Sequence, residues 1–104
     1  MLSNLPMQLV PTVEIHPDPT QPRKSRRLDE YETLKASIAE HGIIHPLLVR
    51  RDHLTGRLIL IAGESRWLCA QDLSIDHVPS RIVDEELSAA QILTLQILEN
   101  LMRQ

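Results

Sequence analysis

The chain has few cysteine and aromatic residues, and it lacks long apolar runs. Cys69 is the only cysteine among 104 residues, so an internal disulfide is excluded, which favours a reducing compartment. Tyr31 and Trp67 are the only aromatic residues, so the core must be mainly aliphatic. No apolar run approaches the ~20 residues that span a bilayer, and residues 1–9 lack the pattern of a signal peptide. We expect a soluble cytoplasmic domain with no membrane partner.

An excess of positive charge is also missing. The chain carries 11 Lys and Arg against 14 Asp and Glu, so its net charge is −3. Residues 1–57 hold eight basic and seven acidic side chains (+1), whereas residues 58–104 hold three and seven (−4). This balance argues against wrapping duplex DNA by bulk charge. The local exception is the basic run at 23–27, which is either a solvated loop or an anion clamp.

Aliphatic segments separated by turn residues fill most of the chain. Their patterns predict strands over 10–15, 43–51, 57–62 and 78–83, and helices over 29–41, 65–73 and 84–104. Glu85 and Glu86 favour the first turn of the last helix, which reaches the end of the chain without a stop signal. We expect a loose leader over 1–9 and one domain over 10–104, cut from a longer protein. Strands and helices mix without strict alternation, so the predicted class is α+β, a small mixed β-sheet with packed helices.

Local signals refine these elements. Asp29 can cap the first helix, and one face of that helix should pack inward through Tyr31, Leu34 and Ile38. Gly42 fits the position just after the helix. In the strand over 78–83, Ser80 and Arg81 are expected at an edge or in solvent.

The turn after residues 58–62 is the most informative local pattern. An apolar strand ends at Gly63, and Glu64, Ser65 and Arg66 follow at the start of a helix. Glycine permits close backbone approach, a helix N-terminus attracts anions, and arginine supplies a fork of donors. The turn therefore fits phosphate binding, although it is not a P-loop. A plain strand–turn–helix connection looks the same, and Ser65 either caps the helix or contacts a phosphate.

A second group of polar residues lies late in the last helix. Glu99 and Asn100 offer hard oxygen ligands for Mg²⁺, and Arg103 can reach a phosphate. Glu99 and Arg103 are also four residues apart, the ordinary spacing of a helical salt bridge. Trp67 and Cys69 are interpreted as core packing.

The segment over 16–23 contains three prolines, which make a stiff, extended loop. Such a loop can hold Gln21 and Arg23 in one place, or it can simply connect two elements.

In this order and at these separations, the motifs resemble the N-terminal domain of the ParB family of chromosome and plasmid partition proteins. The resemblance covers residues 10–103, nearly the whole chain. It rests on Pro17-Asp18-Pro19-Thr20-Gln21-Pro22-Arg23, His41-Gly42-Ile43, Gly63-Glu64-Ser65-Arg66-Trp67 and Glu99-Asn100-Leu101-Met102-Arg103. It implies the α+β fold shared by ParB and sulfiredoxin.

The resemblance also implies a site for CTP and Mg²⁺. Carried over residue by residue, it puts four residues at the phosphates: Gly63, Glu64, Ser65 and Arg66. It puts Glu99 and Asn100 at the metal, and places near the nucleotide Gln21, Arg23 and Arg103. It further implies a homodimer that closes as a clamp on DNA, a following helix-turn-helix domain absent here, a ParA-type ATPase partner, and a location on the bacterial nucleoid or a plasmid.

The turn departs from the usual Gly-Glu-Arg-Arg-x-Arg-Ala motif. Ser65 replaces the first arginine and Leu68 the third, so only Arg66 remains. Charge-assisted contacts contribute ~1.5–3 kcal/mol each, so weaker nucleotide binding is expected unless the basic run at 23–27 compensates. Sulfiredoxin itself is disfavoured, because Glu64 and Ser65 stand where its catalytic cysteine belongs.

These observations favour a CTP-dependent, DNA-associated partition domain, with CTP hydrolysis as its candidate enzymatic activity. One alternative is a nuclease or small-molecule kinase on the same scaffold, in which Glu64 and Glu99 act as acid–base groups or metal ligands. Another is a ParB-like interaction domain without nucleotide binding.

Overall fold

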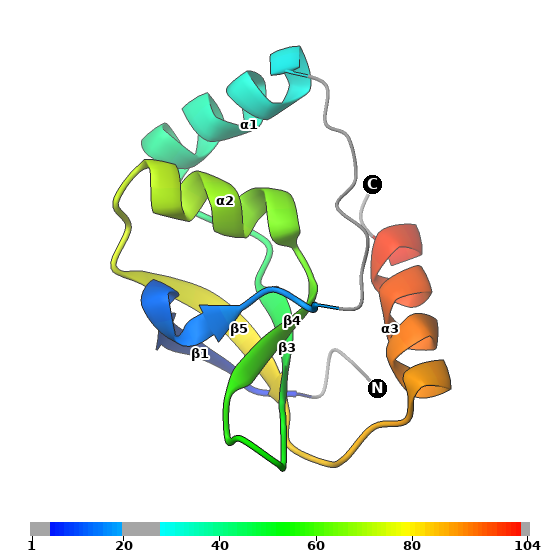
Figure 1. The fold of residues 1–104 in the computed structure, drawn as a ribbon. Helices are drawn as coiled ribbons and strands as arrows, with labels where there is room; N and C mark the ends of the chain where they lie inside the picture. Colours follow the sequence, from blue (N-terminus) through cyan, green and yellow to red (C-terminus); the bar gives the residue numbers. More distant parts are fainter. Residues whose placement is uncertain (1–4, 20–27, 103–104) are drawn as a thin grey trace.

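The computed structural model describes residues 5–19 and 28–102, and Figure 1 shows their arrangement. The chain forms, in order, β1 (Met7–Pro11), the short 3₁₀ helix η2 (Thr12–Glu14), β2 (Ile15–His16), α1 (Leu28–His41), β3 (Leu47–Arg51), β4 (Leu58–Ala62), α2 (Glu64–Asp72), β5 (His77–Val83) and α3 (Ala89–Met102).

The five strands form one sheet in the order β1-β5-β3-β4-β2. β1 pairs antiparallel with β5, and β3 pairs antiparallel with β4. The β3–β5 and β2–β4 pairs are parallel. The predicted class, an α+β fold with a small mixed sheet, is confirmed.

Both faces of the sheet are covered. In β3, Leu47 and Val49 pack in one core cluster and Leu48 in the other, because successive side chains of a strand point to opposite faces. The first cluster includes Trp67 of α2, and the second includes Leu95 of α3. Figure 1 shows α2 between the sheet and α1, with α3 on the other side.

The start of the chain differs from the prediction. The predicted strand over 10–15 is divided into β1, η2 and β2, and the last residues of the expected leader belong to β1, where Met7 pairs with Arg81. β5 therefore lies inside the sheet between β1 and β3. Ser80 is fully buried, so its expected place at an edge or in solvent was wrong. Arg81 is half-buried and donates a hydrogen bond to the carbonyl of Leu5.

The first helix is close to the prediction. α1 begins at Leu28, so Asp29 lies in its first turn and does not precede the helix as a cap. Ile38 is buried and Tyr31 is half-buried on the inward face. Gly42 has a φ of 76°, and its N–H donates to Ile38 O at 2.8 Å, which confirms its expected place after the last helical residue.

The last helix begins later than predicted. α3 starts at Ala89, so Glu85 and Glu86 precede it. The Gln91 N–H donates to Ser88 Oγ at 3.1 Å, and the Ser88 N–H donates to Gln91 Oε1 at 2.8 Å. This reciprocal pair is a capping box, which fixes the first turn at Ser88.

Candidate functional site

Gly63 forms the connection between β4 and α2, and its backbone requires glycine. Its φ is 105° and its ψ is 25°, in the left-handed region, and it precedes the first residue of α2. A Cβ atom at this position would lie 2.7 Å from Leu47 Cδ2 and 3.1 Å from Arg66 Nη2. The turn is therefore packed tightly against β3 and against its own arginine.

The Arg66 side chain is buried, with the whole residue 5% exposed. Its Nη1 donates to the carbonyls of His45 at 2.6 Å and Pro46 at 2.9 Å. Its Nη2 donates to Glu99 Oε2 at 2.8 Å. The guanidinium thus joins three parts of the fold: the turn after β4, the segment before β3, and α3.

Glu99 brings the predicted polar residues of α3 next to the turn at Gly63. Its side chain is 17% exposed in the ion pair with Arg66. Asn100 follows it in α3 and is exposed, and Glu64 and Ser65 are half-buried in the first turn of α2. Gly63 is the N-cap of α2, so Ser65 lies inside the first turn and the interpretation of Ser65 as the cap was wrong.

The other predicted site residues lie outside the described part of the chain. These are Gln21, Arg23 and Arg103, together with the basic run at 23–27. The carbonyls of His45 and Pro46, by contrast, were not predicted as parts of the site. No sequence signal marks them, because every residue carries a carbonyl and only the fold decides which ones converge on Arg66.

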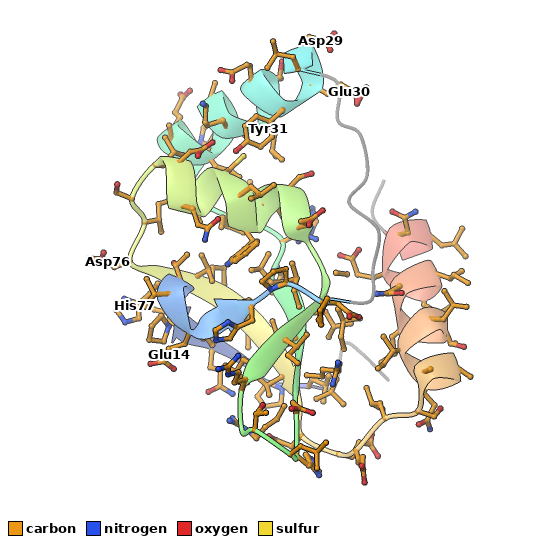
Figure 2. All side chains as sticks on the ribbon, viewed as in Figure 1. Glu14, Asp29, Glu30, Tyr31, Asp76 and His77 are labelled. Atoms are coloured by element: carbon orange, nitrogen blue, oxygen red, sulfur yellow. The ribbon has the colours of Figure 1, made fainter. Side chains whose placement is uncertain are left out.

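A separate polar cluster joins α1 to α2. Tyr31 Oη donates to Asp72 Oδ2 at 2.5 Å, and Figure 2 shows Tyr31 between the two helices. Burial and the hydrogen bond to Asp72 raise the pKa of the Tyr31 hydroxyl. Burial also raises the pKa of the Cys69 thiol, and Cys69 is fully buried. Its predicted role in packing is confirmed.

Within residues 5–19 and 28–102, no group of three or more His, Cys, Asp or Glu side chains is placed to hold a metal ion. None of the helices in this part is long and apolar enough to cross a bilayer.

Residues 2–101 match the family model of the ParB N-terminal domain. This chain belongs to the ParB N-terminal domain family. Its curated relatives include the nucleoid occlusion protein of Bacillus licheniformis, which is 37% identical over 98 residues. Stage 0 sporulation protein J of Bacillus subtilis is 37% identical over 103 residues. These alignments cover 94% and 99% of this chain but only 34% and 35% of the relatives, so this chain spans about a third of their length.

Solved structures of the ParB family share the fold. ParB from Caulobacter crescentus complexed with CTP-gamma-S superimposes with a TM-score of 0.81 at 34% identity, over 95% of this chain and 54% of that one. The same protein complexed to the centromeric parS site gives 0.71 at 32% identity, over 92% and 48%. Sulfiredoxin from Arabidopsis thaliana gives 0.67 at 19% identity, over 88% and 96%. At 19% identity, the likeness to sulfiredoxin shows a shared fold and nothing about function. That shared fold is the one predicted from the sequence.

Proposed function

We propose that this ParB domain binds CTP with Mg²⁺ at the Gly63 turn and the facing part of α3, as a nucleotide-dependent switch in DNA partition. The observation that carries the proposal is the likeness to Caulobacter crescentus ParB, which was solved with CTP-gamma-S. The turn offers a helix N-terminus, which favours phosphate groups. We place Gly63, Glu64 and Ser65 beside the triphosphate.

Arg66 couples the phosphates to α3 in this proposal. Its Nη2 donates to Glu99, so a phosphate that reaches the guanidinium competes with the Glu99 carboxylate. Occupancy of the site would then change how firmly α3 is held. Gln21, Arg23 and Arg103 are proposed to complete the site from segments outside the described residues.

The proposed Mg²⁺ ligands are Glu99 and Asn100. One carboxylate and one amide oxygen are too few for an all-protein cage, but Mg²⁺ usually binds through one or two carboxylates together with substrate phosphates. The residues therefore fit a metal that is held jointly with the nucleotide. When bound, Mg²⁺ would neutralise phosphate charge.

Isothermal titration with CTP, ATP, GTP and UTP, each with and without Mg²⁺, tests the proposal. We expect a saturable heat with CTP that depends on Mg²⁺, and at least tenfold weaker binding to the other nucleotides. The Arg66→Lys variant keeps the charge but loses the planar fork and should weaken CTP binding at least tenfold. The control Arg51→Lys lies in an exposed ion pair with Asp84 and should leave binding unchanged.

A second variant tests the metal. Asn100→Ala removes an exposed amide and leaves the Arg66–Glu99 pair intact, so only the Mg²⁺-dependent part of the binding should fall. No heat with any nucleotide, or equal binding of all four, would overturn the proposal. Release of inorganic phosphate from CTP measures whether binding is followed by hydrolysis.

The likeness to Caulobacter crescentus ParB also supports a proposal for the function of the whole protein. We infer that a following helix-turn-helix domain reads a DNA site, since Caulobacter crescentus ParB was also solved with parS. We further propose a homodimer closed by CTP, a ParA-type ATPase partner, and a cytoplasmic place on a nucleoid or plasmid. Sedimentation of the full-length protein with and without CTP tests the dimer.

A further inference from the structure

The Nη2 atom of Arg66 lies between the Gly63 turn and α3. A Cβ atom added to Gly63 would lie 3.1 Å from Nη2, so this side of the guanidinium lies against the turn. The same atom donates to Glu99 Oε2 at 2.8 Å. Glu99 therefore occupies a donor that a phosphate beside Gly63 would need.

The other terminal nitrogen of Arg66 is fixed by the backbone. Nη1 donates to the carbonyls of His45 at 2.6 Å and Pro46 at 2.9 Å, in the segment just before β3. Because the guanidinium is a rigid planar fork, these two contacts also fix the direction of Nη2. Arg66 cannot keep them and turn away from Glu99, so a phosphate at Nη2 must meet the carboxylate where it lies.

Glu99 is the partner that can leave this contact. Its carboxylate has no hydrogen bond or ion pair with another described residue, whereas Arg66 also holds two carbonyls. The side chains of Arg66 and Glu99 are 6% and 17% exposed. Removing one partner of a buried pair leaves an uncompensated charge, so Arg66 needs another anion when Glu99 departs. Arrival of a phosphate and departure of Glu99 are thus one exchange.

We propose that Glu99 competes with phosphate for Arg66 and becomes available as a Mg²⁺ ligand only after it is displaced, an inference that rests on the proposed function. Two anions at one guanidinium repel each other, so without metal the Glu99 carboxylate weakens nucleotide binding. With metal the sign reverses, because a displaced carboxylate can share Mg²⁺ with the phosphates. The nucleotide would therefore bind before the metal.

Glu99→Gln separates the two roles, because the amide keeps the shape and an acceptor oxygen for Arg66 but loses the charge. NMR titrations of the backbone amides give the dissociation constant for CTP in EDTA and with Mg²⁺. In EDTA, Glu99→Gln should bind CTP at least threefold more tightly than the unsubstituted chain. With Mg²⁺ it should bind at least threefold more weakly. A purely structural role of Glu99 would weaken binding in both conditions.

The order of binding is tested with Mn²⁺, which broadens the amide signals of residues near the bound ion. Added alone, Mn²⁺ should leave the amide signals of Glu99 and Asn100 sharp at concentrations that broaden them once CTP is present. This measurement uses the unsubstituted chain, so it stands whatever Glu99→Gln does to the fold.

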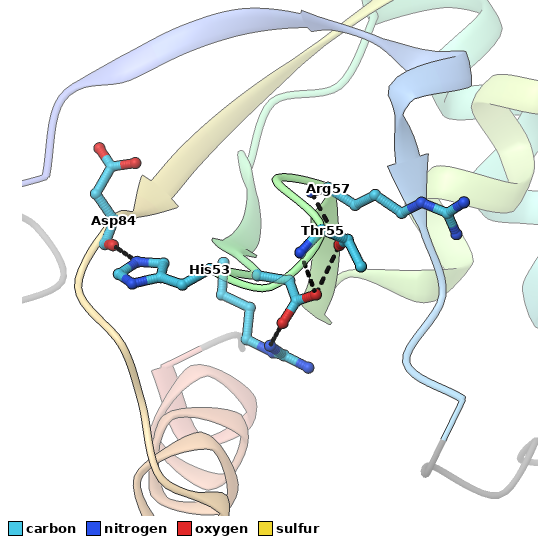
Figure 3. A network of polar contacts seen from close by, with 6 residues as sticks. His53, Thr55, Arg57 and Asp84 are labelled. Carbon is cyan, nitrogen blue, oxygen red and sulfur yellow. Dashed lines mark hydrogen bonds and ion pairs between the residues drawn. The ribbon is translucent and has the colours of Figure 1, made fainter.

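Asp84→Asn is the matched control. Asp84 also pairs with an arginine, Arg51, at 2.9 Å, so the substitution removes the same charge from an ion pair. Figure 3 shows Asp84 beside His53, at the hairpin that joins β3 to β4. The length of β4 separates this hairpin from Gly63. Asp84→Asn should change both dissociation constants less than twofold.

The two proposals fail on different results. No gain in affinity for Glu99→Gln in EDTA would overturn the competition, and broadening of Glu99 and Asn100 by Mn²⁺ alone would overturn the order of binding. Absence of CTP binding by the unsubstituted chain with Mg²⁺ would overturn the proposed function itself.

Discussion

At the scale of single residues, Gly63 offers the sharpest test of the turn. Gly63→Ala adds a Cβ 2.7 Å from Leu47 Cδ2 in a backbone with a φ of 105°. Left-handed backbone costs a non-glycine residue about 1–2 kcal/mol, and overpacking adds about 1–3 kcal/mol. We expect a loss of roughly 3 kcal/mol in the free energy of unfolding, measured by urea denaturation.

Gly42→Ala is the matched control for this substitution. Gly42 also has a positive φ, 76°, but a Cβ there would meet nothing within 4 Å. It should therefore cost only the backbone strain, about 1–2 kcal/mol. Equal losses at the two glycines would contradict the close packing of the turn against β3.

Tyr31 supplies a pH test at the same scale. Burial and the hydrogen bond to Asp72 raise its pKa in the folded chain, whereas the unfolded chain should titrate near 10. The folded state then retains a proton that the unfolded state loses, so stability is complete below about pH 10 and falls as the pH rises further.

The single tyrosine makes this measurement direct. Ultraviolet absorbance of tyrosinate should give a midpoint above 10 in the folded chain and near 10 in urea. Tyr31→Phe should remove most of the alkaline loss of stability, and Cys69, whose thiol pKa is also raised, should account for a remainder. A folded midpoint equal to that in urea would contradict the Tyr31–Asp72 contact.

At the scale of elements, one buried side chain and one ion pair attach α3 to the sheet and to Arg66 in the described part of the chain. Leu95 is the only buried residue of α3 among those whose exposure is described, and Glu99 adds the ion pair with buried Arg66. Glu99→Ala leaves that guanidinium without its carboxylate, which costs on the order of 3 kcal/mol for a buried pair. We expect faster amide hydrogen exchange in α3 and a matching loss of stability in urea.

The exposed pair of Arg51 and Asp84 is the control. Its side chains are 43% and 74% exposed, and pairs of this kind contribute about 0–1 kcal/mol. Asp84→Ala should therefore cost far less than Glu99→Ala. If the two substitutions cost the same, Arg66 does not depend on Glu99 in solution.

The sequence predicted the elements whose signals are local. β3 and β4 are aliphatic runs bounded by proline, glycine or charge, and Gly42 ends α1 as expected. β1 was missed because Met7-Gln8-Leu9 becomes a strand only through pairing with β5. The same omission made Ser80 look exposed. The start of α3 was missed because Glu85 and Glu86 also suit a first helical turn, whereas the reciprocal hydrogen bonds of Ser88 and Gln91 fix the helix start.

The candidate site was predictable in its parts but not in its contacts. Local pattern identified Gly63 and Arg66, and the order of motifs placed Glu99 in the same site. The Arg66–Glu99 hydrogen bond spans 33 residues and could not be read from either segment alone, because it depends on how α3 returns across the sheet.

At the scale of the whole molecule, one sheet serves two cores. Adjacent residues of β3, Val49 and Leu48, belong to the clusters under α2 and α3 respectively. If the packing on one face is lost, β3 is also disturbed for the cluster on the other face, because both clusters contain its residues. This shared sheet should make unfolding cooperative across the domain, including α3, whose one buried residue, Leu95, packs in the second cluster.

Trp67 and circular dichroism can test that cooperativity together. Trp67 is the only tryptophan and is 7% exposed in the cluster under α2, so its fluorescence reports the face opposite α3. We expect its urea transition to coincide with the far-ultraviolet dichroism of all helices, as in two-state unfolding. In Glu99→Ala the helical signal should begin to fall at lower urea than the Trp67 signal, because the lost ion pair weakens only the attachment of α3. Separate transitions in the unsubstituted chain would mean that α3 detaches independently, and coincident transitions in Glu99→Ala would mean that the apolar contacts at Leu95 suffice to hold it.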